Sequence, residues 1–361
     1  MQVCVIGAGL AGTTLAWRLA QLPSVQLALA PGPTAAADAT AASGGLVRGF
    51  ETNPAQRRLA IDSLLELLAD PVLRDWSGYT RCGSLYLPAT EDGLEQVMAE
   101  LEADLPGSAQ LIDTAGLASR GWAELEPGTV AVFEAEAGYL NPDRLRRSLL
   151  ADLAEQPNAT LLPAGQVTEI GGGGFTLDGV RHDYDLVVLA TGPWTPGLLR
   201  EHGLDATGLR TKAIQYTTHQ ASGMPSTSFV DDRTDLYGKP VPGGVLLGLP
   251  TENWDVLSME PDLALSAAAT ELALRRFPGL RVQASNTPIT AVDCYSASGL
   301  LCLRPADGDR LFTFTGGTGG AAKTALAASR AAAIQLVELS EGRQERPETP
   351  STLIGRRSES S

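Results

Sequence analysis

The stretch QVCVIGAGLAGTTLAWRLAQLPSVQLALA occupies residues 2–30 and decides the fold. Its apolar start, Gln2–Ile6, predicts a short buried strand. The Ala- and Leu-rich run Thr13–Leu22 predicts a helix that ends at the following proline, and Val25–Ala30 predicts a second buried strand. A strand, a helix and a strand in such close succession predict a βαβ unit of a parallel sheet.

Three glycines lie between the first strand and the helix. Gly7, Gly9 and Gly12 have the spacing G-x-G-x-x-G. In this context Gly7 permits a tight turn, Gly9 lets a pyrophosphate approach the backbone, and Gly12 lets the helix pack close to the strand. The N–H groups at the helix start then attract the phosphates. The motif predicts a dinucleotide site with contacts from Gly7, Gly9, Leu10, Ala11 and Gly12.

One expected feature of such a site is absent. A carboxylate normally stands about 20 residues after the motif, at the end of the second strand, and holds the ribose hydroxyls. Here that strand ends in Leu29-Ala30-Pro31, and the first acidic residue of the chain is Asp38. Either another group holds the ribose or the nucleotide is bound less tightly. No arginine stands there to indicate a 2′-phosphate.

Composition narrows the classes of partner. The chain has 361 residues, 43% of them hydrophobic, and a formal net charge of −15. Nucleic acids and anionic membrane surfaces bind concentrations of Lys and Arg, so this balance argues against both. No apolar run approaches the length of a membrane span, and the chain starts without the features of a secretory signal. Because the cysteines and histidines show no disulfide or metal-ligand spacing, we expect no metal and a cytoplasmic location.

Lysine is rare in this chain. Of the 27 basic residues, only Lys212, Lys239 and Lys323 are lysines. A chain that uses arginine by default keeps a lysine either by chance on its surface or where an ammonium is needed. These three residues are therefore candidate site residues.

Periodicity and capping residues predict the other main elements. Asn53 and Pro54 suit the N-cap and the first position of a helix that ends near Ala69, and Pro142 opens another helix. Further helices are expected over about 91–105 and 262–277 and in the Ala-rich run that ends at 339, and strands over 84–87, 185–190 and near 311. Residues 341–361 are polar and contain proline, which predicts a disordered tail.

Six blocks of the chain resemble, in order, the motifs of one family. They are GAGLAGTTLAWRLA (7–20), SGGLVRGFE (43–51), RCGSLYLP (81–88), GYLNPDRLRRSLL (138–150), ATGPWTPGL (190–198) and TGGTGGAAKTALAAS (315–329). Together they resemble the D-amino-acid oxidase superfamily, in particular its glycine oxidase and sarcosine oxidase branch. The resemblance covers most of the chain and implies that the dinucleotide is FAD.

The resemblance also implies an architecture. It is an α/β fold in which a Rossmann-type FAD-binding domain is interleaved with an antiparallel-sheet substrate domain. We expect residues 1–78, 138–204 and 296–340 in the FAD-binding domain, and residues 79–137 and 205–295 in the substrate domain.

The family motifs imply further contacts with FAD. The block at 43–51 resembles the loop beneath the flavin, and the block at 315–329 resembles the glycine loop that closes over it. Backbone N–H groups at a helix start after that loop suit the electron-rich end of the flavin ring. The additional expected contacts are Ser43, Gly44, Gly45, Val167, Thr191, Gly192, Trp194, Gly317, Thr318, Gly319, Gly320 and Lys323.

Four side chains are candidates for contact with a substrate. Lys323 stands directly after the glycine loop, where the sarcosine oxidase branch has a lysine that binds the substrate carboxylate, and Arg48 falls near the second anchor of that branch. A guanidinium can bind a carboxylate through two hydrogen bonds. A salt bridge at the domain seam is the alternative role for both residues. His219 and Tyr237 are further candidates for the substrate pocket.

The chain departs from the branch at two points. Oxidases of the branch carry a lysine in the strand after Y-G-x-P-x-x-G-G that speeds the reaction of reduced flavin with oxygen. The strand after YGKPVPGG has none here, and Lys239 stands at a different position. Sarcosine oxidases also link the flavin to a cysteine in a C-x-Y-T segment. Alignment on Tyr295 puts Asp293 at that position and Cys294 beside it, which leaves open both a covalent link through Cys294 and an ordinary buried cysteine.

These features predict an FAD-dependent oxidoreductase that oxidises the C–N bond of an amino acid or secondary amine by hydride transfer to flavin N5. Its electron acceptor is molecular oxygen or another molecule, which makes it a slow oxidase or a dehydrogenase. One alternative is an FAD-dependent 2-hydroxy-acid dehydrogenase, which needs a general base, and His219 is the histidine available for it. The others are a nicotinamide dehydrogenase without flavin and a catalytically impaired flavin-binding homologue.

Overall fold

The computed structural model describes residues 1–33 and 39–342. Its first sheet has the strand order β20-β21-β13-β1-β2-β9. Neighbouring strands in it run parallel, except for the antiparallel pair β20–β21. The strands are β1 Gln2–Ile6, β2 Gln26–Ala30, β9 Ala159–Leu161, β13 Leu186–Leu189, β20 Cys302–Asp307 and β21 Leu311–Thr315. The predicted tail falls outside the described residues from residue 343 onward, as does Asp38.

The predicted βαβ unit is confirmed, with α1 (Leu10–Ala20) connecting the parallel pair β1 and β2. Glycine is required at two points where backbones meet. A Cβ atom at Gly12 would lie 1.9 Å from the carbonyl oxygen of Gly7. Gly7 itself has a φ of 110°, and a Cβ atom there would lie 2.4 Å from the carbonyl oxygen of Ala190. The start of α1 can therefore pack tightly against the ends of β1 and β13.

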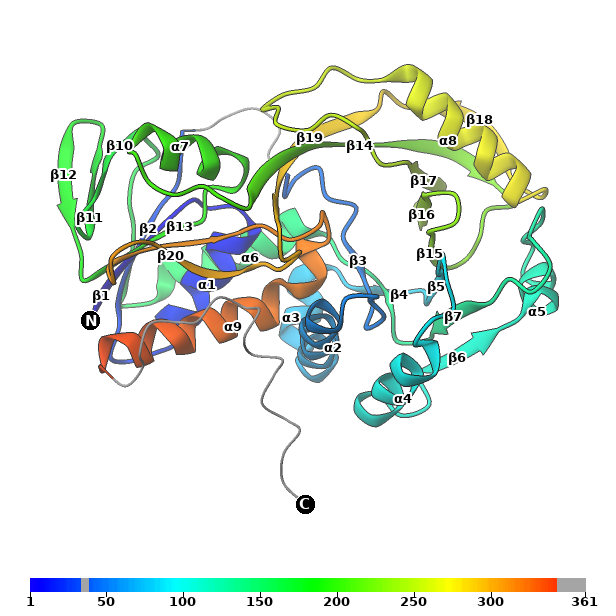
Figure 1. Ribbon diagram of the computed structural model, residues 1–361, viewed down its shortest axis with the longest axis horizontal. Coiled ribbons are helices and arrows are strands. Elements are labelled where there is room, and N and C mark those ends of the chain that lie inside the picture. Colours follow the sequence, from blue (N-terminus) through cyan, green and yellow to red (C-terminus); the bar gives the residue numbers. More distant parts are fainter. Residues whose placement is uncertain (34–38, 343–361) are drawn as a thin grey trace.

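Helices cover one face of the first sheet (Figure 1). α1 packs against α6 (Pro142–Glu155) and α9 (Ala321–Ser340), while α2 (Pro54–Ala69) packs against α9 and α3 (Pro71–Ser77) packs against α6. The predicted cap of α2 is confirmed, because the Asn53 side chain accepts a hydrogen bond from the Gln56 N–H at 3.1 Å. The core of this layer includes Val3, Val5, Leu15, Leu145, Phe312, Phe314 and Leu326.

A small antiparallel sheet and a short helix cover the other face of the first sheet. They are β10 (Val167–Gly171), β11 (Gly174–Leu177), β12 (Val180–Asp183) and α7 (Thr195–Glu201), which follows the 3₁₀ turn η1 (Gly192–Trp194). Their shared core contains Cys4, Ile6, Phe175, Leu189, Leu199 and Cys294.

The second large sheet has the order β18-β14-β17-β16-β15-β5-β7-β6, and β19 pairs with the first half of β14. Its strands are β5 Ser84–Leu87, β6 Ala109–Ile112, β7 Ala131–Glu134, β14 Leu209–Ser222, β15 Ser228–Asp231, β16 Leu236–Val241, β17 Gly244–Gly248, β18 Arg281–Ser285 and β19 Ile289–Ser296. The expected antiparallel pairing holds except between β5 and β15, which run parallel. This exception arises because two separate segments of the chain supply the sheet.

Helices also pack on the second sheet. α8 (Leu263–Arg276) covers a core that includes Phe229, Leu247 and Phe277. α4 (Leu94–Asp104) and α5 (Thr114–Ser119) flank its outer strands. No helix of the described residues is long and apolar enough to cross a membrane.

The long strand β14 joins the two halves of the molecule (Figure 1). Its first half pairs with β19 beside the first sheet, and its second half pairs with β17 and β18. A short sheet of β3 (Leu46–Val47), β8 (Gly138–Tyr139) and β4 (Thr80–Arg81) lies between the halves. These connections place the residues of β3 and of β14 on the walls of the same cavity, which is described below.

The variant Gly12→Ala tests the close approach at the start of α1. Its Cβ atom would lie 1.9 Å from a backbone oxygen that cannot move without displacing β1. We expect the free energy of unfolding to fall by about 1–3 kcal/mol in urea denaturation, as for other overpacked positions. Gly44→Ala is the matched control, since a Cβ atom there meets nothing within 4 Å. Equal stability of the two variants would contradict the described packing.

Candidate functional site

A cavity of about 630 Å³ opens where strands of the first sheet end. Ile6, Pro31 and Ala190 on its wall mark the carboxyl ends of β1, β2 and β13, which is where ligands of open α/β sheets bind. We call it the dinucleotide cavity. The predicted cofactor contacts on its wall are Gly7, Gly9, Leu10, Ala11, Ser43, Val167, Thr191, Gly192, Trp194 and Gly319.

Two helices begin at this cavity with a glycine at the N-cap, which has no side chain to occupy the first N–H groups. Gly9 precedes α1, and the first N–H of that helix, on Leu10, donates to Thr40 Oγ1 at 2.9 Å. Gly320 precedes α9, whose first residues, Ala321 and Ala322, line the same cavity. Uncapped helix starts present N–H donors and a positive dipole end. The cavity volume, the glycines and these donors fit the phosphates and the flavin of FAD.

Three predicted cofactor residues, Gly12, Gly317 and Cys294, line neither this cavity nor the adjoining one described below. Gly12 packs beneath Gly7, so it shapes the site from below. The carbonyl oxygen of Gly317 accepts a hydrogen bond from the Ser296 N–H at 3.3 Å. Gly317 therefore stabilises the backbone of the glycine loop through this hydrogen bond.

The wall of the dinucleotide cavity contains a cation that the sequence did not reveal. Where a ribose carboxylate is expected, Pro31, Gly32 and Pro33 line the wall. Arg146 of α6 also lines the cavity and forms an ion pair with Asp143. An arginine on an amphipathic helix carries no motif, so only the packing of α6 reveals this position.

A second cavity of about 310 Å³ adjoins the first, and we call it the substrate cavity. Its size lies near the lower end for small-molecule pockets, which span roughly 300–1,000 Å³. The two cavities share the wall residues Ala39, Ser43, Asp293, Gly319 and Ala322. The substrate cavity also contains Gly44, Gly45, Arg48, Tyr237, Thr318, Gly320 and Lys323 from the predicted set.

Arg48 and Lys323 meet at one buried carboxylate. Glu51 Oε1 lies 2.8 Å from Arg48 Nη2 and also forms an ion pair with Lys323 Nζ. The three side chains are only 7–8% exposed. Burial raises the pKa of Glu51, but the charges of Arg48 and Lys323 outweigh it and hold the pKa below its ordinary value. Among the described residues, Arg48 and Lys323 therefore share a single carboxylate as their ion-pair partner.

The carboxylates of this cluster stand behind the cations. Arg48 and Lys323 line the substrate cavity, whereas Glu51 and Glu134 do not. Glu134 accepts hydrogen bonds from the backbone N–H groups of Gly49 at 2.7 Å and Phe50 at 3.0 Å. Burial raises its pKa, which favours the neutral carboxyl. The cluster therefore presents positive charge to the cavity.

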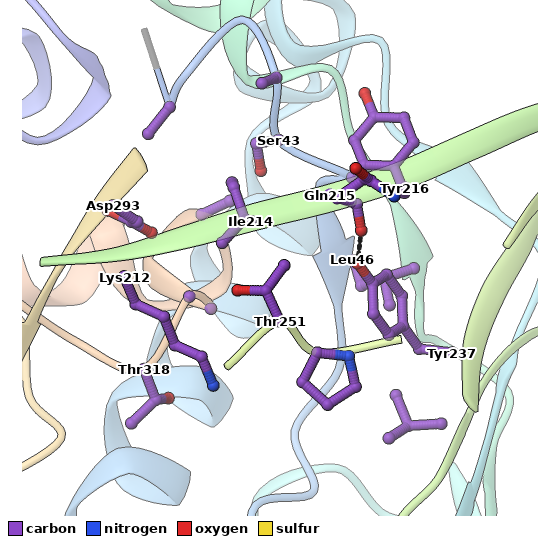
Figure 2. A pocket seen from close by; sticks show the side chains of 18 of the residues that line it. Ser43, Leu46, Lys212, Ile214, Gln215, Tyr216, Tyr237, Thr251, Asp293 and Thr318 are labelled. Carbon is purple, nitrogen blue, oxygen red and sulfur yellow. Dashed lines mark hydrogen bonds between the residues drawn. The ribbon is translucent and has the colours of Figure 1, made fainter. Parts of the chain in front are cut away.

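Tyr237 lines the substrate cavity, and its hydroxyl donates to the Gln215 carbonyl oxygen at 2.9 Å (Figure 2). Its ring covers Gly248 of β17, where a Cβ atom would lie 2.3 Å from Tyr237 Cζ. β17 thus has neither a lysine nor room for a side chain at this glycine. Lys239 lies on β16 with its Nζ 4.1 Å from the centroid of the Tyr139 ring, and it lines neither cavity. Burial lowers its pKa to about 8.

His219 lines neither cavity, although it was expected in the substrate pocket. His219 is buried in the part of β14 that pairs with β17 and β18, beyond the cavity, and its Nδ1 lies 2.9 Å from Ser285 Oγ. The strand continues past the pocket, so a residue of the strand does not have to face it.

The structure also gives no support to a covalent link through Cys294. Successive side chains of a strand point to opposite faces. On β19, Asp293 lines both cavities, whereas Cys294 is buried in the core beside Phe175. Burial raises the pKa of the Cys294 thiol to about 11, which opposes thiolate chemistry. It also raises the pKa of Asp293 to about 6.

Comparison with known proteins agrees with this geometry. Residues 2–334 match the profile of the DAO family, described as FAD dependent oxidoreductase. A comparison with curated protein sequences found no significant match.

Solved structures share the fold at low sequence identity. Glycine oxidase from Geobacillus kaustophilus is 19% identical, with a TM-score of 0.74 over 97% of this chain and 96% of the other. L-proline dehydrogenase from P. horikoshii is 16% identical, with a TM-score of 0.77 over 96% and 95%. L-amino acid deaminase from Proteus vulgaris is 15% identical, with a TM-score of 0.71 over 96% and 95%. With the family profile matching nearly the whole chain, this protein belongs to the DAO family of FAD-dependent oxidoreductases.

Proposed function

We propose that this enzyme oxidises the C–N bond of an amino acid or of a secondary amine that carries a carboxylate. The observation that carries the proposal is the pair Arg48 and Lys323, which shares one buried carboxylate and lines a cavity that adjoins the dinucleotide cavity. A substrate carboxylate at this pair would complete a set of two cations and two anions. Buried charges are stable when they are paired in this way.

The chain's own residues bind and orient the substrate. Arg48 and Lys323 hold the carboxylate, which fixes the α-carbon relative to the cofactor, and positioning of this kind contributes strongly to catalysis. Tyr216 and Tyr237 line the wall and exclude water. When bound, FAD supplies the acceptor for the hydride that leaves the α-carbon as the C–N single bond becomes C=N. Water then hydrolyses the imine to a carbonyl compound and an amine.

We infer that reduced flavin passes its electrons to an acceptor other than oxygen, or that it reacts with oxygen only slowly. β17 carries no lysine, and the Tyr237 ring occupies the space next to Gly248. Both an oxidase and a dehydrogenase stand among the similar structures, so the fold is compatible with either acceptor.

A 2-hydroxy-acid dehydrogenase is less well supported. That reaction needs a general base at the substrate hydroxyl. His219 lies beyond the cavity, and neither His182 nor His202 lines it. An amine needs no such histidine, since its nitrogen lone pair assists departure of the hydride.

For the cofactor, we infer non-covalent FAD with Arg146 at the nucleotide end of the dinucleotide cavity. Arg146 lines that cavity, the end of β2 carries no ribose carboxylate, and an arginine can donate to phosphate or ribose oxygens. The glycine motif and the starts of α1 and α9 supply backbone N–H donors.

Replacement of Arg146 tests this assignment. Loss of a charged hydrogen bond costs about 1.5–3 kcal/mol, so we expect Arg146→Ala to raise the Kd for FAD by roughly 10- to 100-fold. The measurement is titration of apoprotein by quenching of FAD fluorescence. Arg147→Ala is the matched control, because Arg147 pairs with the same Asp143 but is 69% exposed. Equal affinities of both variants would remove Arg146 from the site.

Replacement of the anchor tests the reaction. We expect Lys323→Met to raise the apparent Kd for an amino-acid substrate by roughly 100-fold in anaerobic flavin reduction, since loss of a buried ion-pair partner costs several kcal/mol. We expect His219→Gln to keep the reduction rate within about twofold. The hydroxy-acid alternative gains support if His219→Gln abolishes reduction while a 2-hydroxy acid reduces the wild-type flavin.

Burial and the Arg48 charge lower the pKa of Lys323, so substrate affinity should fall as the pH rises and less so in Lys323→Arg.

A further inference from the structure

A third cation lines the substrate cavity. Lys212 stands on β14, on a different element from Arg48 and Lys323. Those two residues share Glu51, whereas no carboxylate of the described residues lies within ion-pair distance of Lys212. Its ammonium lies 4.7 Å from the centroid of the Trp254 ring. Lys212 is therefore a half-buried charge on a pocket wall with an aromatic ring as its neighbour.

Among the described residues, the carboxylate that stands opposite Lys212 in the sheet forms no ion pair with it. Asp293 of β19 stands directly opposite Lys212 in the antiparallel register. The Asp293 side chain accepts a hydrogen bond from the Cys294 N–H at 2.9 Å. In Figure 2 the Lys212 side chain extends away from Asp293, toward the Thr318 side of the cavity. The ammonium is thus directed into the pocket.

The surroundings of Lys212 are held in place by the backbone. The Ala213 N–H donates to the Asn253 carbonyl oxygen at 2.9 Å, and Lys212 forms a β-bridge with Trp254. The Thr251 hydroxyl donates to the Ala213 carbonyl oxygen. These bonds fix the segment after β17 along β14 and keep the Trp254 ring beside the lysine. The backbone of this wall is therefore organised in advance of binding, and the Trp254 ring lies beside the ammonium.

The other acidic residues of the wall, Asp232 and Asp235, form no ion pair with Lys212 either. Asp232 accepts a hydrogen bond from the Tyr86 hydroxyl, and burial raises its pKa. Asp235 is exposed in the turn between β15 and β16. Both belong to that turn, on different elements from Lys212. With one substrate carboxylate at Arg48 and Lys323, the Lys212 charge would still lack a partner.

We propose that Lys212 binds a second anionic group of the substrate, so that the enzyme acts on amino acids with two carboxylates. This class includes aminodicarboxylates and amino acids with a carboxyalkyl group on nitrogen. The inference rests on the proposed function, because it assumes that Arg48 and Lys323 hold the first carboxylate. The cavity of about 310 Å³ suits a small dicarboxylate.

Ligand titration of the FAD-loaded enzyme tests the proposal. Propionate, succinate and glutarate are added separately, and the visible flavin spectrum reports binding. We expect the better dicarboxylate to bind at least tenfold more tightly than propionate in the wild type. In Lys212→Met we expect that ratio to fall below about twofold while the propionate affinity stays unchanged. Lys212→Arg should keep most of the preference.

A matched control separates the cavity charge from general charge effects. Arg210→Met removes a cation that lies over the same Trp254 ring, but Arg210 pairs with Asp255 and does not line the cavity. It should leave every affinity unchanged. A dicarboxylate preference that is absent in the wild type, or that survives in Lys212→Met, would overturn the proposal. If no carboxylate of either kind perturbs the flavin, the proposed function fails as well.

Discussion

The ion pairs of Glu51 with Arg48 and Lys323 connect the loop before α2 to the start of α9. Removing one partner of such a buried cluster typically costs 3–5 kcal/mol, since an uncompensated charge remains. Further contacts reinforce this connection, including the hydrogen bond from Gln56 Nε2 to Thr318 Oγ1 at 2.6 Å. The glycine loop before α9 is thereby fixed against α2, and it forms walls of both cavities.

The charge of this cluster matters because the chain as a whole is acidic, with a net charge of −15. An anionic substrate is repelled by the average field and has to meet a local positive site. Two cations alone would be costly to bury, and two cations with two ionised carboxylates would attract no anion. Glu51 is held ionised by its neighbours, whereas burial favours the neutral form of Glu134. Arg48 and Lys323 thus line the cavity with Glu51 behind them as their shared buried counterion.

The sequence was sufficient for the fold and for most of the backbone contacts that line the dinucleotide cavity, because glycine spacing and apolar periodicity are local signals. Asn53, Gly12 and the helix from Pro142 follow directly from such signals. The ion-pair partners of Arg48 and Lys323 were not predictable from the sequence. Glu51 contacts Lys323 only because the start of α9 packs against the loop before α2. The sequence also does not predict which residues of a strand face a cavity. His219 and Cys294 lie on strands β14 and β19 but line neither cavity. The expected domain boundaries and the roles of the site residues stay predictions.

The most direct test of the central claim is a titration of the FAD-loaded protein with propionate and with propanamide, its neutral isostere. The visible flavin spectrum is the readout. A positive charge at Arg48 and Lys323 beside the flavin should bind only the anion, so we expect a saturable spectral change with propionate and none with propanamide. Equal responses to both compounds, or a response to neither, would contradict a carboxylate anchor at this site.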